Sequence, residues 1–278
     1  MFKKNTQMKN ILLGATLLSI VACNNANNKV TTKDTTDKKE TSMSPGSVIK
    51  LDSSKRYIFL TWDDGPQPPG TTVSKNVFKQ QGIKATFFVV GMNQVGPQKK
   101  RIIDSLRTEY PQFLIANHSF SHANINGRDN YPLFYKQVES TLQDFLKNEK
   151  EMQVPVKIIR LPGNNAWVNK GQIQGPKSTL AVCKGLDSMG FSVIGWDVEW
   201  NQYKGVPKES VAEMIKKVNS KFDEGNTYEP NCVVILSHDR LFAKPQYADS
   251  LSKFIATLKQ DPRNVFETID HLPMVMKK

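Results

Sequence analysis

From residue 48 onward, short apolar runs alternate with helix-compatible stretches, and this alternation constrains the fold more than any other feature. Six apolar runs are typical of buried strands: residues 57–62, 85–90, 113–116, 156–161, 191–196 and 232–236. Six further stretches predict helices: residues 73–81, 98–108, 133–148, 178–189, 208–222 and 247–258. Such alternation favours parallel strands with helical crossovers, as an open sheet or a barrel. The length of this part, about 230 residues, suits one large α/β domain better than two small ones.

The first 22 residues have the pattern of a targeting segment. Three lysines precede an apolar stretch at residues 11–22, which is too short to span a bilayer comfortably. Ala22 is followed directly by Cys23, as in a bacterial lipobox, so we expect cleavage to leave Cys23 as a lipid-modified N-terminus. An ordinary cleaved signal peptide that contains a cysteine is the alternative.

Residues 23–47 have the composition of a flexible tether, because they are rich in Asn, Thr, Lys and Ser and almost without large apolar side chains. The sequence therefore predicts a lipoprotein signal peptide at 1–22, a disordered tether at 23–47 and a catalytic or binding domain at 48–278. The lipid on Cys23 would hold this domain at a membrane. Since no Asp follows Cys23, the outer membrane or the cell surface is favoured over the inner membrane.

Composition narrows the partners and the environment. The net charge is +12, but the lysines are spread along the chain and no nucleic-acid motif accompanies them. We therefore expect no nucleic-acid partner and a basic surface that faces an anionic envelope. In the predicted domain, an exported location permits a disulfide between Cys183 and Cys232, and two buried free thiols are the equal alternative.

Chemically reactive residues gather at the ends of the predicted strands. They are Asp63, Asp64, His118, His122, Arg160, Asp197, Glu199 and His238. The carboxyl ends of parallel strands form one face of an α/β fold, so residues that are distant in the sequence converge there. This placement predicts an active site at that face.

Asp63 and Asp64 are adjacent carboxylates that follow a buried strand directly. Two carboxylates this close repel, and both stay ionised only if a cation or strong hydrogen-bond donors hold them. The economical arrangement places one acid on a metal and uses the other to transfer protons. A solvated Asp-Asp-Gly-Pro turn is the alternative.

The histidines favour the metal-site interpretation. His118 and His122 are spaced i, i+4, which on a helical turn points two imidazoles the same way. With Asp64 as third ligand, two nitrogens and one oxygen leave coordination positions for water and substrate, as in catalytic sites. His238 follows a buried strand and is either a general acid or a satisfied histidine at a strand edge. His271 is interpreted as a surface residue.

Four motifs together resemble the polysaccharide deacetylases, the NodB-homology group of carbohydrate esterase family four. They are Thr-Trp-Asp-Asp-Gly-Pro at 61–66, His-x-x-x-His at 118–122, Arg-Leu-Pro-Gly at 160–163 and Leu-Ser-His at 236–238. They occur in the order and approximate spacing of that family, over about residues 55 to 270. The resemblance implies a distorted (β/α) barrel and a metal-dependent hydrolase that removes acetyl groups from N-acetylated sugars.

The resemblance also assigns roles to single residues. Asp64, His118 and His122 would hold the divalent metal, commonly zinc in this family. Asp63 would be the general base that deprotonates the attacking water. Arg160 would pair with Asp63 and keep it ionised and aimed.

The general acid for the departing amine would be His238, which needs a carboxylate nearby to set its tautomer. Here the sequence departs from the family, which often has Asp-x-x-Asp-Trp where this chain has Trp-Asp-Val-Glu-Trp at 196–200. Asp197 or Glu199 could serve, since alternation along a strand would send both to the same face. Asp197 is favoured. Trp167, after the arginine motif, would either stack on a sugar ring or be ordinary packing.

The sequence thus predicts a tethered N-deacetylase that acts on an acetylated polysaccharide of the envelope or the surroundings. An O-acetyl esterase with the same machinery is one alternative, because an alkoxide leaves more easily than an amine. A glycan-binding protein that has lost catalysis is the other, and it is disfavoured because every catalytic role has a candidate residue.

Overall fold

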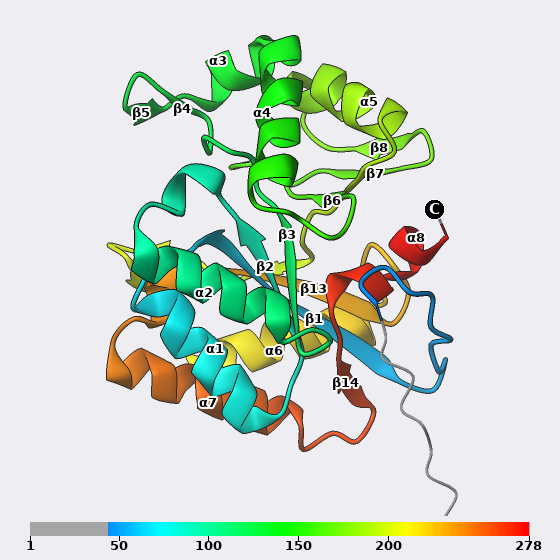
Figure 1. Cartoon of the computed structure of the whole chain (residues 1–278). Helices are drawn as coiled ribbons and strands as arrows, with labels where there is room; N and C mark the ends of the chain where they lie inside the picture. The colour runs from blue at the N-terminus through cyan, green and yellow to red at the C-terminus, as the bar shows by residue number, and fades with distance from the viewer. Residues whose placement is uncertain (1–43, 278) are drawn as a thin grey trace, which may run out of the picture. The chain divides into compact units, whose positions relative to one another are not determined.

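A ten-stranded, mostly parallel sheet lies at the centre of the computed structural model, which describes residues 44–277 (Figure 1). Its strands are β1 (Arg56–Gly65), β2 (Ala85–Val89), β3 (Phe113–Asn117), β6 (Ile158–Ile159), β7 (Trp167–Asn169), β8 (Gln172–Gln174), β9 (Ser192–Val193), β10 (Val198–Glu199), β13 (Cys232–His238) and β14 (Asn264–Phe266). The predicted signal peptide, the lipid site at Cys23 and most of the predicted tether lie outside the described residues.

The strand order is β10-β13-β1-β2-β3-β6-β9-β7-β8, with β14 also paired to β1. Every pairing in this sheet is parallel except those of β7 with β8 and β9. The fold class implied by the family resemblance, a distorted (β/α) barrel of parallel strands, is confirmed, and so are the mostly parallel strands expected from the alternation. The strands predicted at 156–161 and 191–196 are present but shorter than predicted. Only two residues of each form regular strand pairings, as β6 and β9.

The helices between the strands also follow the sequence pattern. They are α1 (Gly70–Gln81), α2 (Pro97–Thr108), α3 (Tyr131–Lys136), α4 (Val138–Glu151), α5 (Leu180–Ser188), α6 (Val211–Asp223), α7 (Pro245–Leu258) and α8 (Pro273–Met276), with 3-10 turns at Gly91–Asn93, Lys177–Thr179, Asp239–Phe242 and Ile269–His271. The helix predicted at 133–148 is in fact two, because the backbone of Gln137 leaves the helical region between α3 and α4. At the start of α6, Ser210 and Glu213 form a capping box.

Two groups of helices surround the sheet (Figure 1). Helix α7 contacts both α1 and α6, whereas α5 contacts α4 and the β7–β8 hairpin. Apolar side chains of β1, β2, β3 and β13 form the larger core, and Trp62 lies inside it against Phe78 and Phe242. Cys183 and Cys232 are buried free thiols, so the structure favours that alternative over a disulfide.

His271 is fully buried, which contradicts the surface position expected from the sequence. The turn Ile269–His271 places it inside the protein, where its Nδ1 lies 2.9 Å from Oε1 of Glu267. Buried Ile269 and Leu272 flank it and carry the turn into the core. The burial of these two apolar neighbours is the physical reason that the prediction failed.

Two short hairpins complete the description. They are β4 (Asn124–Ile125) with β5 (Arg128–Asp129), and β11 (Gln202–Tyr203) with β12 (Val206–Pro207). Each contributes residues to the cavity described below. Within residues 44–277, no helix is long and apolar enough to cross a bilayer.

Candidate active site

The carboxyl end of β1 brings both adjacent acids to one cavity. In a regular strand, the consecutive side chains of Asp63 and Asp64 would point to opposite faces. The pairing of β1 with β2 shifts register between Asp63 and Gly65, and Asp64 has a positive φ of 73°. This irregularity lets both carboxylates line a cavity of about 490 Å³, although each is almost fully buried.

Most of the predicted site residues meet at this cavity. Besides the two acids, the residues with predicted roles that line it are His118, His122, Glu199 and His238. Arg160 reaches the same place through its contact with Asp63. Asp197 is the exception and lines a neighbouring cavity.

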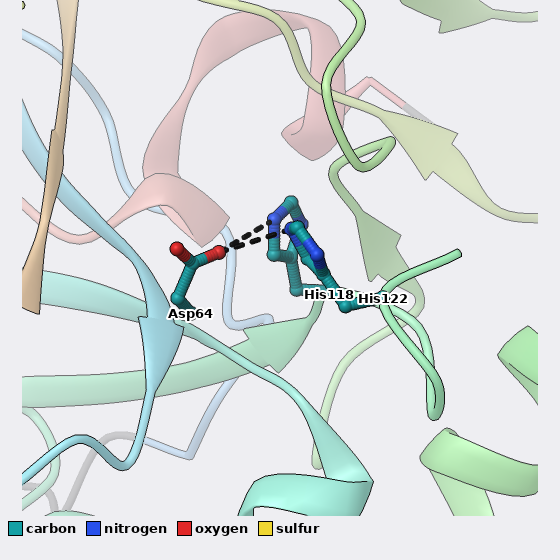
Figure 2. Close-up of side chains that lie close together, drawn as sticks. All are labelled: Asp64, His118 and His122. Atoms are coloured by element: carbon teal, nitrogen blue, oxygen red, sulfur yellow. Dashed lines mark ion pairs between the residues drawn. The ribbon is translucent and has the colours of Figure 1, made fainter. Parts of the chain in front are cut away.

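Asp64, His118 and His122 form a cluster with the geometry of a metal site (Figure 2). Oδ1 of Asp64 lies 3.6 Å from Nε2 of His118 and 3.1 Å from Nε2 of His122. One ligand atom from each residue lies within 4.8 Å of the other two. Burial by itself raises the pKa of Asp64, but the contacts with the two histidines outweigh it and hold the pKa well below its usual range.

The other ring nitrogen of each histidine already has a contact. Nδ1 of His118 donates to the Arg160 carbonyl oxygen at 2.9 Å, and Nδ1 of His122 lies 3.6 Å from Oδ2 of Asp129. These contacts leave both Nε2 atoms facing Asp64, which is the arrangement that orients imidazole ligands in metal sites. Oδ1 of Asp64 is buried and makes no hydrogen bond in the described part of the chain. Two nitrogens and this oxygen therefore fit a divalent cation.

The histidine pair does not lie on a regular helix, contrary to the expectation from its spacing. Residues 118–122 form an irregular loop in which Ser119 and His122 have positive φ. Asp144 accepts hydrogen bonds from the backbone N–H groups of Phe120 and Ser121, and Asn117 accepts one from Ser119. The side chains of Asp144 and Asn117 thus fix the loop that carries both histidines.

Arg160 holds Asp63 from the interior of the protein. Its Nη1 donates to Oδ1 of Asp63 at 2.9 Å and to Oγ1 of Thr61 at 2.6 Å. Nη2 and Nε donate to the carbonyl oxygens of Gly195 and Ile194. Burial lowers the pKa of Arg160, and the charge of Asp63 counteracts that effect. The guanidinium is fully buried and satisfied, so it is a fixed counter-charge beside the Asp63 carboxylate.

His238 lies beside Asp63 in the parallel register of β13 and β1. Burial lowers the pKa of His238, although the negative charges of Asp64 and Asp63 act against this shift. Its Nδ1 is buried and has no hydrogen-bond partner among residues 44–277. The predicted carboxylate support for this nitrogen is therefore not present in the structure.

Asp197 accepts hydrogen bonds from backbone N–H groups and does not contact His238. Its two carboxylate oxygens accept hydrogen bonds from the N–H groups of Tyr228 and Val234, both at 2.8 Å. Strand β10 begins only at Val198, so strand alternation does not apply to Asp197, and Glu199 alone faces the catalytic cavity. Burial, together with the charge of Asp63, raises the pKa of Glu199.

Trp167 does not line the cavity of the two acids but the neighbouring one, and its contacts favour packing, one of the two alternatives left open by the sequence. It is 5% exposed and stacks on Tyr228 with ring centroids 4.1 Å apart. Trp196, which the sequence did not single out, lines both the catalytic cavity and the neighbouring one.

Two charged residues of the site were missed by the sequence analysis. Arg240 donates from Nη1 to Oδ2 of Asp64 at 2.8 Å, and Asp129 contacts His122. Arg240 follows His238 by two residues at a strand end, so its position was a usable signal. Asp129 comes from the β4–β5 hairpin, for which the sequence offered no pattern.

Asp239 lies directly behind the site and is fully buried. It accepts a hydrogen bond from the Thr71 hydroxyl, and its backbone carbonyl approaches α1 so closely that a Cβ on Gly70 would lie 1.9 Å from the oxygen. Burial raises the pKa of Asp239 to about 8. The carboxyl is therefore mostly neutral in the folded protein at pH 7.

The raised pKa of Asp239 predicts a pH-dependent loss of stability. Between about pH 4 and pH 8 the folded state keeps a proton that the unfolded state has released, so the free energy of unfolding falls as pH rises. Asp239→Asn removes this dependence. We expect the variant to gain stability relative to the wild type, by at most about 1.4 kcal/mol per pH unit. Urea denaturation of both proteins at pH 5, 6, 7 and 8, with a chelator present, measures this gain. A stability difference between variant and wild type that does not change with pH would contradict the raised pKa of Asp239.

Comparisons with known proteins show what this chain resembles. Residues 50–173 match the polysaccharide deacetylase family. A peptidoglycan-N-acetylglucosamine deacetylase of Bacillus cereus is 27% identical over 207 residues, which are 74% of this chain and 64% of that protein. A chitin deacetylase of Colletotrichum lindemuthianum is 26% identical over 219 residues, 77% of this chain and 78% of that one.

A solved structure with the same fold is that of a Streptococcus mutans CE4 esterase. It is 25% identical, has a TM-score of 0.55, and the match covers 77% of this chain and 86% of that one. The matched segment contains β1, β2, β3 and β6 with both acids, both histidines and Arg160. Residues 50–173 therefore resemble the polysaccharide deacetylase family in sequence, and the fold is that of the CE4 esterase structure.

Proposed function

We propose that this protein hydrolyses N-acetyl groups of an N-acetylglucosamine-containing polysaccharide with the help of a divalent metal, most simply zinc. One observation carries the proposal. A carboxylate with a fixed arginine partner, Asp63, shares a cavity with a cluster of two histidines and one aspartate that fits a cation. The substrate class comes from the two relatives, whose names specify peptidoglycan N-acetylglucosamine and chitin.

In this mechanism Asp64, His118 and His122 would hold the metal. When bound, the metal acts as a Lewis acid on the acetyl carbonyl and lowers the pKa of the attacking water. Asp63 accepts a proton from that water, and the hydrogen bond from Arg160 keeps the carboxylate oriented for this transfer.

His238 then protonates the departing amine. Because burial lowers the pKa of His238, its imidazolium form is a stronger acid than an exposed one and gives up its proton readily. Glu199 lines the same cavity, and its negative charge would stabilise the His238 imidazolium before that proton is transferred to the amine. We assign this supporting role to Glu199 in place of Asp197, whose oxygens are held by backbone N–H groups.

The proposed location is the outer membrane or the cell surface, with the domain tethered through a lipid on Cys23. The support is the sequence of residues 1–47, which has the order of a basic start, a short apolar run, a small residue, a cysteine and a polar segment. Labelling with a radioactive fatty acid tests the anchor, and Cys23→Ser is expected to abolish the label. A Cys23→Ser variant that is still labelled would contradict it.

Acetate release from purified substrates tests the activity. We expect release from chitooligosaccharides or peptidoglycan, loss of at least about 90% of turnover after dialysis against a chelator, and recovery on adding zinc or cobalt. Acetylated xylan is the comparison substrate. Release from xylan alone would identify an O-acetyl esterase, and binding without release in the presence of metal would identify a glycan-binding protein.

A further inference from the structure

Each of the two adjacent acids has its own arginine, and the two arginines differ in freedom. Arg160 is fully buried and donates hydrogen bonds to four groups. The side chain of Arg240 is 41% exposed at the cavity. In the described part of the chain, Arg240 donates from Nη1 to Oδ2 of Asp64 at 2.8 Å and from Nε to Oε1 of Gln202 at 3.1 Å. Arg240 can therefore leave its acid at much lower cost than Arg160 can.

The two carboxylate oxygens of Asp64 have different partners. Oδ1 faces the Nε2 atoms of His118 and His122, whereas Oδ2 accepts from Arg240. A guanidinium at this distance places a full positive charge close to the position that a cation would take between the three ligand atoms. It also occupies the second oxygen, which a metal could otherwise use for bidentate binding.

We propose that Arg240 is an internal counter-ion of Asp64 that weakens metal binding and thereby keeps the metal exchangeable. The proposal rests on the proposed metal site at Asp64, His118 and His122. Arg240 acts as a positioning residue on Asp64. Arg240 weakens cation binding whether its guanidinium stays on Oδ2 of Asp64 or moves toward solvent. If it stays, the two positive charges repel; if it moves, the metal must displace it.

Two substitutions separate charge from shape. Arg240→Gln removes the positive charge but keeps an amide that can donate to Asp64, and Arg240→Lys keeps the charge as a compact ammonium. Arg263→Gln is the matched control, because Arg263 is an exposed arginine paired with Asp261 outside the cavity. The dissociation constant for zinc is measured for each full-length protein by competition with a chromophoric chelator.

The expected result is zinc binding about tenfold tighter in Arg240→Gln than in the wild type. Arg240→Lys is expected within about threefold of the wild type, and Arg263→Gln unchanged. The melting temperature gives a second readout. Without metal, Arg240→Gln melts lower because Asp64 has lost its counter-ion, and saturating zinc raises its melting temperature more than that of the wild type.

Each outcome decides the proposal. Unchanged or weaker zinc binding in Arg240→Gln overturns it. An equal fall in melting temperature with and without zinc also overturns it, because Arg240 would then be only structural. If the wild type itself binds no divalent metal, the proposed function fails instead, so the two failures are distinguishable.

Discussion

Asp63→Asn is expected to lower kcat by about 10²–10⁴-fold while the protein still binds its metal. The amide cannot accept the proton of the attacking water, whereas Asp64, His118 and His122 all remain in place. Acetate release from chitooligosaccharides gives kcat, and chelator competition gives the metal dissociation constant. Turnover within tenfold of the wild type would remove Asp63 from the role of general base.

The matched variant is Asp64→Asn, one residue along the same strand. Here we expect metal affinity and turnover to fall together, because the variant loses the anionic oxygen that both histidines face. The contrast between the neighbours is the informative result. If both variants lose metal equally, the division of labour between the two acids is wrong.

Arg160→Met is expected to lower the free energy of unfolding by about 3–5 kcal/mol, because it leaves Asp63 as a buried carboxylate without its cation. Urea denaturation at pH 7 measures this. Arg160→Lys keeps the charge but loses the forked hydrogen bonds, and should fall between the wild type and the methionine variant. If Arg160→Met does not fold, the free energy of unfolding of Arg160→Lys tests the prediction instead.

The control for this prediction is a double variant. Adding Asp63→Asn to Arg160→Met removes the unpaired charge, so we expect it to restore part of the lost stability. Arg263→Met, at an exposed ion pair, should change stability little. A double variant less stable than Arg160→Met alone would contradict the buried-charge explanation.

Sequence reasoning identified the fold and much of the site because both depend on strands. The apolar run at 57–62 predicted the start of β1 to within one residue, although the strand continues to Gly65. Parallel strands bring their carboxyl ends together regardless of loop details. Asp63, Asp64 and Arg160 therefore converge as expected. His118 and His122 also converge, although a loop fixed by Asp144 holds them, and i, i+4 spacing alone cannot distinguish that loop from a helix.

The remaining errors arise where the chain leaves regular structure. Asp197 lies one residue before β10 begins, so the two-residue period that predicted its direction did not apply. Asp129 reaches His122 from a hairpin of two-residue strands, which is too short to leave a periodic pattern. His271 was predicted to be exposed because it is a polar residue near the C-terminus without partners in the sequence. Its buried apolar neighbours instead carry it into the core.

The pairing of each acid with its own arginine also affects when the protein can fold. Two neighbouring carboxylates without counter-ions would oppose folding until an ion arrived. Arg160 and Arg240 are encoded in the same chain, so both acids are neutralised as soon as β1 meets its neighbours. On the proposed function, folding would therefore not have to wait for ion uptake. A chain that crosses a membrane unfolded could complete its structure first and collect its ion afterwards from whatever supply the new compartment offers.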